Sequence, residues 1–305
     1  MSTDIIAPID PADEVPDIRQ VAIGDLKHAL VKGFDDFRAM PTHVVFLCLI
    51  YPVVGLLIGR LAFGYNVLPL LYPMAAGFAL LGPFLAIGLY ELSRRREAGL
   101  DTSWHHAFDV RYSPSLPGIL LLGGLLLLIF TVWVAIAHSL YVATFGYAEP
   151  TSLNTFAQQV LTTKQGWYLA IVGNLVGFLF ALLVLMLTVV SFPMLLDRHV
   201  GAPSAMLTSI RVVLKNPVTM ALWGLIIATG LLIGSLPLFF GLAIVLPILG
   251  HATWHLYRRA VEPDSHPRPA FRPRPRRIRY GAQFPASLFV PSAVEDQQTE
   301  KGDRS

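Results

Sequence analysis

Long apolar runs separated by short polar segments dominate the chain between residues 42 and 258. A helix needs about 20 mainly apolar residues to cross a hydrocarbon core that is ~30 Å thick. Six runs reach that length, at residues 42–63, 66–92, 116–145, 165–195, 217–235 and 237–258. The pattern predicts an all-α fold, a polytopic membrane bundle of six transmembrane helices.

The composition supports a membrane class. Hydrophobic residues make up 54% of the 305 residues and charged residues only 14%, whereas soluble domains carry about 25% charged residues. So little charge cannot cover the surface of a water-soluble globule, and much of this surface is expected to face lipid. The N-terminus lacks the basic and apolar regions of a cleavable signal peptide, so the first run is expected to remain as an anchor.

The positive charges predict an orientation, because cytoplasmic loops are enriched in lysine and arginine. With the N-terminus inside, the two short inner loops hold seven such residues, and the outer loops hold only Arg60 and Lys164. Both termini are therefore expected in the cytoplasm, and the predicted location is the bacterial cytoplasmic (inner) membrane.

Three short amphipathic segments precede the first, third and fifth runs, near residues 24–39, 102–112 and 203–215. Their apolar residues recur at the three- and four-residue spacing of a helix face, and prolines follow them. Such helices are expected to lie along the inner membrane interface. The predicted apolar faces are Leu26, Leu30, Phe34 and Phe37, with Asp36 placed elsewhere; Trp104, Ala107 and Phe108; and Met206, Ile210, Val213 and Leu214.

Internal similarity suggests three units, each an interfacial helix followed by a transmembrane hairpin. Pro83, Pro193 and Pro247 all fall in the inner half of an even-numbered run, and arginine pairs begin 11 residues after the first and the last of them. Units that run in the same direction would be related by an axis along the membrane normal. The transmembrane domain is predicted over residues 21–260. An acidic tail (1–20) and a Pro/Arg-rich tail (261–305) are predicted to be disordered.

The segments Gly24–Ala29, Gly33–Phe37 and Glu91–Arg96 resemble an uncharacterised bacterial multi-pass membrane family, domain of unknown function 2189. The resemblance covers roughly residues 20–260. It implies a helical membrane fold and supplies no catalytic residues. Some members are labelled cytochrome oxidase subunits, but the histidine patterns that hold haem and copper in such subunits are absent here.

Three polar residues near the inner ends of the second and sixth runs form a speculative polar site: Glu91, His251 and His255. The two histidines lie four residues apart and so share one helix face, a spacing that can hold a metal. Glu91 and His255 each lie eight residues past their proline, so a direct pair is one hypothesis. The alternative is a set of interfacial anchors beside an arginine cluster, and no metal or cofactor is predicted.

Glycine pairs and a basic cluster predict packing and lipid contacts. Glycines four residues apart allow close helix packing, within the bundle or in a homo-oligomer, and arginines just inside the membrane favour anionic headgroups or only fix topology. The glycines are Gly55, Gly59, Gly173, Gly177, Gly230 and Gly234. The arginines are Arg258, Arg259, Arg268, Arg272, Arg274, Arg276, Arg277 and Arg279.

The sequence contains no phosphate-binding loop, catalytic triad, zinc-protease motif or cysteine cluster. This absence argues against an enzyme of a recognisable class. The first hypothesis is a non-enzymatic accessory, assembly or lipid-organising factor, with anionic lipid or another membrane protein as partner and no nucleic acid. A facilitator-type transporter or channel for a small uncharged or apolar solute is the second. A metal- or haem-dependent membrane enzyme is the third.

Overall fold

The computed structural model describes residues 16–40, 68–147, 152–237 and 241–263, together with Gly55 and Gly59. Within these ranges the chain is helical, and the one extended pairing is an antiparallel bridge between Ile18 and Val261. The chain divides into two units, residues 1–269 and 270–305, and every described residue lies in the first. The predicted all-α class is confirmed for this part of the chain.

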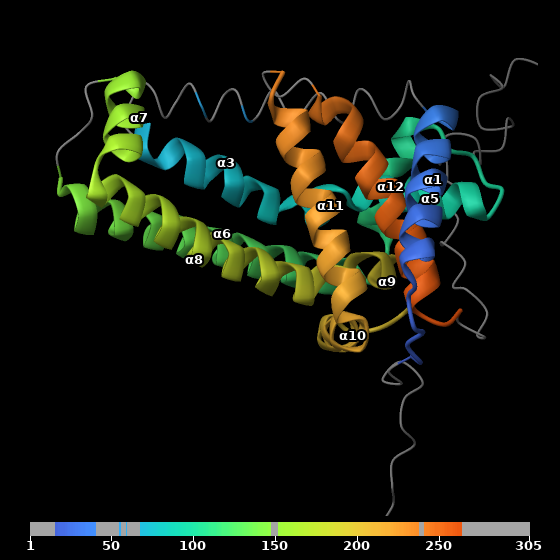
Figure 1. Cartoon of the computed structure of the whole chain (residues 1–305). Helices are drawn as coiled ribbons and strands as arrows, with labels where there is room; N and C mark the ends of the chain where they lie inside the picture. Colours follow the sequence, from blue (N-terminus) through green and yellow to red (C-terminus); the bar gives the residue numbers. More distant parts are fainter. Residues whose placement is uncertain are drawn as a thin grey trace, which may run out of the picture. The chain divides into compact units, whose positions relative to one another are not determined.

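Three helical segments among the described residues are long and apolar enough to cross a membrane. They are α6 (Leu116–Phe145), α11 (Pro217–Ser235), and α8 (Lys164–Thr188) continued by α9 (Ser191–Asp197). Helices α6 and α8 pack side by side (Figure 1). Many of their large apolar side chains are exposed, Leu121 by 62% and Phe178 by 61%, as expected of helices in lipid. These segments agree with three of the six predicted runs.

The second predicted run, residues 66–92, is a series of short helices and not one continuous helix. The short η2 (Leu68–Leu70) leads into α3 (Leu71–Leu80), followed by α4 (Gly82–Leu85) and α5 (Ile87–Glu97). Pro83 lies at the start of α4, where its missing backbone N–H interrupts the hydrogen bonding of α3. The first run, residues 42–63, lies outside the described residues except for Gly55 and Gly59. A count of six spans is therefore not established.

Helix α1 (Ile23–Ala39) lies antiparallel against α12 (Leu242–Ala260), the helix predicted as the sixth span (Figure 1). Gly33 allows the close contact, because a Cβ at this position would lie 2.6 Å from the backbone nitrogen of Ala252. Lys27 and Lys32 are exposed on α1, and charged side chains are costly in hydrocarbon. Helix α12 is not among the three candidate spans, which are defined by length and apolar composition.

Helices are present at all three predicted amphipathic segments: α1, the 3₁₀-helix η3 (Trp104–Tyr112) and α10 (Ala202–Lys215). Their buried faces agree with the predicted ones only in part: Leu26, Ala107 and Val213 are buried as predicted. The buried side of α1 is Leu26, Ala29, Gly33 and Asp36, whereas Phe34 is 46% exposed. In η3, Ala107 and Val110 are buried while Trp104 and Phe108 are exposed. In α10, Val212 and Val213 are buried beside small residues, while Leu207 and Leu214 are exposed. Each helix thus buries a mixture of small and apolar residues and also exposes bulky apolar ones.

A further helix, α7 (Leu153–Thr162), precedes α8 and was not predicted. Its first turn is stabilised by Ser152, whose hydroxyl accepts a hydrogen bond from the backbone N–H of Thr155. A serine at this position satisfies one of the free donors at a helix start. The cap explains why a polar loop segment becomes helical.

The chain before α1 is held at the corner between α10 and α11. The N–H of Val21 donates to the side-chain oxygen of Asn216 at 2.7 Å, and the Thr219 hydroxyl donates to the carbonyl of Val21 at 2.9 Å. The N–H of Arg19 donates to the carbonyl of Ala260 at 2.9 Å. The last residues of the predicted N-terminal tail (1–20) are thus bonded to the end of α12. Residues 1–15 and 264–305 lie outside the described part of the chain.

Candidate functional site

Three helices contribute to a buried polar cluster around Asp36 of α1, which is only 3% exposed. The hydroxyl of Ser93, from α5, donates to Asp36 Oδ2 at 2.6 Å. His255 Nε2, from α12, lies 2.9 Å from the same oxygen, and Arg96 of α5 pairs with Oδ1. The carboxylate of Asp36 therefore joins α1, α5 and α12.

His251 completes the Asp36 cluster through Ser93. Its Nδ1 lies 2.6 Å from the serine oxygen. Because the serine proton is directed at Asp36, its oxygen accepts the Nδ1 proton of His251. The result is a chain of hydrogen bonds from His251 through Ser93 to Asp36. His251 is fully buried, so its ring is fixed by the surrounding helices.

The pKa of Asp36 reflects opposing effects. Burial raises the pKa of this carboxyl, but hydrogen bonds from His255 and Ser93 and the charges of His251 and His255 lower it more. The pKa consequently lies below the ordinary value of 3.8. A carboxylate that receives several hydrogen bonds is stabilised in its charged form, so Asp36 is ionised at neutral pH.

Glu91 belongs to a separate ion pair on α5. Its side chain is fully buried and accepts two hydrogen bonds from Arg94, from Nε and Nη2, both at 2.7 Å. Arg95 Nη1 lies 3.9 Å from the same carboxylate. This two-point geometry is the strong form of an arginine–carboxylate pair. The structure thus gives Glu91 and His255 different partners, Arg94 and Asp36. A direct Glu91–His255 pair is not among the contacts of the described residues.

A third polar cluster joins α5, α9 and α12. Arg258 lies 3.0 Å from Glu97 and 3.2 Å from Asp197. The hydroxyl of Tyr257 donates to Asp197 at 2.9 Å, and the indole N–H of Trp254 donates to Glu97 at 3.0 Å. Arg258, predicted to contact lipid, is therefore engaged in internal ion pairs. Of the other predicted lipid-binding arginines, Arg259 is exposed and lies 3.9 Å from Asp25, and Arg268, Arg272, Arg274, Arg276, Arg277 and Arg279 lie outside the described residues.

The glycine pairs differ in what surrounds them. A Cβ at Gly230 would lie 3.2 Å from Val245, and one at Gly234 would lie 2.8 Å from Leu242, so both sit at the contact of α11 with α12. A Cβ at Gly177 would lie 3.1 Å from Trp133 of α6, whereas Gly173 has nothing within 4 Å. Gly55 and Gly59 also have nothing within 4 Å, and the residues around them are outside the described ranges.

Sequence reasoning missed Asp36, Ser93 and Asp197. Asp36 was assigned to the polar side of its helix because the bulky Phe34 and Phe37 seemed to define the buried face. A signal was present: Ala29, Gly33 and Asp36 recur at four- and three-residue spacing, and small residues mark close helix contacts. Ser93 and Asp197 have no local signal, because their partners lie 158 and 60 residues away in the sequence.

The three long apolar helices, with many apolar side chains exposed, are those of an integral membrane protein. Over residues 70–197 the chain matches a family described as a predicted integral membrane protein (DUF2189), and the resemblance expected from the sequence is confirmed for this part of the chain. No curated protein and no solved structure matches it.

Proposed function

We propose that the protein is a non-enzymatic membrane protein that binds and organises anionic lipids at the cytoplasmic face of the bacterial inner membrane. The observation that carries this proposal is the exposure of bulky apolar side chains on α1, η3 and α10. They are Phe34 of α1, Trp104 and Phe108 of η3, and Leu207 and Leu214 of α10. A water-facing helix would place those residues inside, so an apolar environment outside the protein is the natural partner of these faces.

Basic residues accompany the outward apolar faces. Lys27, Lys32 and Arg38 are exposed on α1, Arg111 on η3 and Arg211 on α10. A helix with aromatic or aliphatic residues beside lysine and arginine is typical of one that lies in the headgroup region. Each basic side chain near an anionic surface contributes about 1 kcal/mol. Three such helices on one chain would gather several anionic headgroups around it.

The buried ion pairs support a structural role for the charged residues inside the protein. Asp36, Glu91 and Asp197 each bond to side chains of the same chain. A group that is committed to an internal arginine or tyrosine is poorly placed to exchange protons with a substrate. The proposal that the protein is not an enzyme rests on these internal bonds.

The test compares binding to vesicles of phosphatidylglycerol and of phosphatidylcholine. A variant with Lys27→Gln, Arg111→Gln and Arg211→Gln should lose the preference for the anionic vesicles, by about five-fold for each charge if each contributes about 1 kcal/mol. Lys164→Gln is the matched control, because Lys164 is exposed but lies at the predicted outer end of α8. An unchanged preference in the triple variant, with a loss on truncation after Asp264, would assign lipid binding to the tail and overturn the role of these helices.

A further inference from the structure

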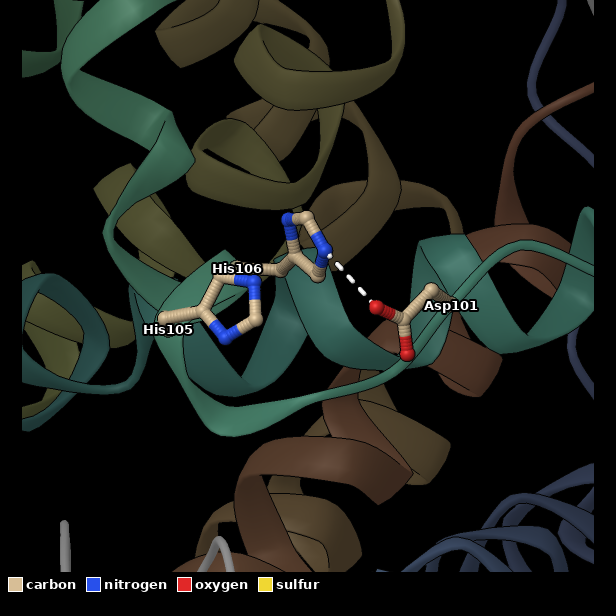
Figure 2. Close-up of side chains that lie close together, drawn as sticks. All are labelled: Asp101, His105 and His106. Carbon is tan, nitrogen blue, oxygen red and sulfur yellow. Dashed lines mark hydrogen bonds and ion pairs between the residues drawn. The ribbon is translucent and has the colours of Figure 1, made fainter.

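The loop that follows α5 and the start of η3 bring one aspartate and two histidines together, as Figure 2 shows. One ligand atom from each of Asp101, His105 and His106 lies within 4.8 Å of the others. The rings of the two histidines lie side by side, with centroids 4.1 Å apart. His106 Nε2 lies 3.1 Å from Asp101 Oδ2. None of these residues takes part in the buried clusters around Asp36 and Asp197.

His106 lies between two carboxylates. Its Nδ1 is 2.5 Å from Asp109 Oδ2 and its Nε2 is 3.1 Å from Asp101 Oδ2. A neutral imidazole carries one proton, so it can donate to only one of them. The other nitrogen then presents a lone pair to a carboxylate oxygen at hydrogen-bond distance, which is repulsive unless a positive ion lies between the two atoms. That ion is either a second proton or a metal.

The surrounding contacts suit a metal. Metal-binding histidines usually donate their second N–H to a carboxylate that orients the ring, and Asp109 occupies that position for His106. Asp109 is itself 3.6 Å from Arg95. If Nδ1 donates to Asp109, the free lone pair of His106 is on Nε2 and faces Asp101.

The position of Asp101 is also fixed by its neighbours. Its Oδ1 accepts hydrogen bonds from the backbone N–H and the hydroxyl of Ser103, at 3.0 and 2.7 Å. Its backbone carbonyl accepts one from Arg95 Nε at 2.6 Å. Oδ1 is thus engaged, and Oδ2 is directed at His106. A site whose ligands are held before the ion arrives binds it with less loss of conformational entropy.

We propose that Asp101, His105 and His106 bind one divalent transition-metal ion, with Zn²⁺ as the best match. Two imidazoles and one carboxylate suit zinc and other first-row divalent ions, and a fourth position is left for water or a further ligand. Calcium and magnesium prefer all-oxygen surroundings and are expected to bind poorly. The metal ligands share η3 with some of the proposed lipid contacts but are different side chains, so the zinc titration and the vesicle assay can fail independently.

The experiment uses the full-length protein, purified in a mild detergent without a polyhistidine tag and stripped of metal by a chelator. Competition against a chromophoric zinc chelator should show one Zn²⁺ per chain. His105→Ala is the most informative variant, because His105 is exposed and contacts the rings of Trp104 and His106. It should weaken zinc binding by at least ten-fold, and Asp109→Asn should weaken it by about 10- to 100-fold.

His199→Ala is the matched control, since His199 is also exposed but belongs to another loop. It should leave zinc affinity unchanged. Cobalt absorption bands of a low-coordinate site with nitrogen and oxygen ligands, lost in His105→Ala, would support the same assignment. The proposal is overturned if the wild-type chain binds no stoichiometric zinc, which would leave a proton between His106 and Asp101. It is equally overturned if His105→Ala, His106→Ala and Asp101→Asn all bind zinc as the wild type does.

Discussion

Helices α6 and α12 are long helices of the same chain, but their buried residues differ in kind. Helix α6 buries Ile119, Leu122, Leu126 and Ile129 along one stripe, and its opposite side exposes equally apolar residues such as Leu121. Helix α12 buries His251, Trp254 and Tyr257, against neighbours that contribute Asp36, Glu97 and Asp197.

The difference shows what determines the specific packing of each region. Along α6 the inside and the outside are both apolar, so the shape of the side chains decides which face packs. Around α12 the contacts are hydrogen bonds and ion pairs, each of which requires a particular partner at a particular place. Loss of one partner should therefore be more damaging near α12 than loss of one apolar contact along α6.

The largest effect is expected for Asp36→Ala. Removal of the carboxylate leaves Arg96, Ser93 and His255 without their shared acceptor, and breaking a buried ion pair costs about 3–5 kcal/mol. The apparent free energy of unfolding, measured by titrating sodium dodecyl sulfate into mixed micelles, should fall by that amount. Asp35→Ala is the matched control, because Asp35 is exposed on the same helix, and it should change stability by about 0.5 kcal/mol or less. Equal losses in the two variants would contradict the buried network.

A smaller effect is expected for Leu122→Ala in α6. Leu122 is fully buried, and truncation of a buried leucine costs about 2–5 kcal/mol. Its neighbour Leu121 is 62% exposed, so Leu121→Ala should cost about 0.5 kcal/mol or less in the same assay. If the Leu121 variant loses as much stability as the Leu122 variant, the Leu121 face of α6 packs against another protein surface. The contrast between α6 and α12 would then not hold.

The smallest effect is expected from acid. Because the folded pKa of Asp36 lies below its ordinary value of 3.8, its contribution to stability is fully present above pH 3.8 and is lost as the pH falls through the folded pKa. Protonation keeps the shape of the side chain, so the loss should be smaller than in Asp36→Ala. The groups that face Asp36 are Arg96, His251 and His255, together with the Ser93 hydroxyl.

The control for the acid prediction is Asp36→Asn, which has nearly the same shape and no charge. Melting temperatures of the two proteins in detergent should differ most at neutral pH and should converge below pH 3.8. A constant difference over the whole range would show that Asp36 is not the group that titrates.

The sequence predicted the membrane class and three of the long helices correctly because length and apolar content alone determine them. The bounds of α6 and α11 agree with the predicted runs 116–145 and 217–235. The buried faces were predicted only in part, since α6 is apolar all round and α1 buries Gly33 and Asp36 beside Leu26 while Phe34 is exposed.

The candidate site was only partly visible in the sequence. His251 and His255 stood out because polar residues are rare near the ends of apolar runs, and both lie in the buried cluster. Their partner Asp36 was missed, because the small residues beside it mark a helix contact but do not identify a partner 219 residues away. The breaks in the second run were missed for a different reason: Pro83 was read as part of a span, although it starts a new short helix.

The antiparallel pairing of α1 with α12 also constrains the order of events during synthesis. Helix α1 leaves the ribosome among the first segments, while its partner His255 is added 219 residues after Asp36. At about 5–20 residues per second, the N-terminal helix waits roughly 10 to 45 s with its aspartate and glycine surface uncovered. During this interval α1 must be kept from wrong associations, and its packing is completed only after α12 has been synthesised.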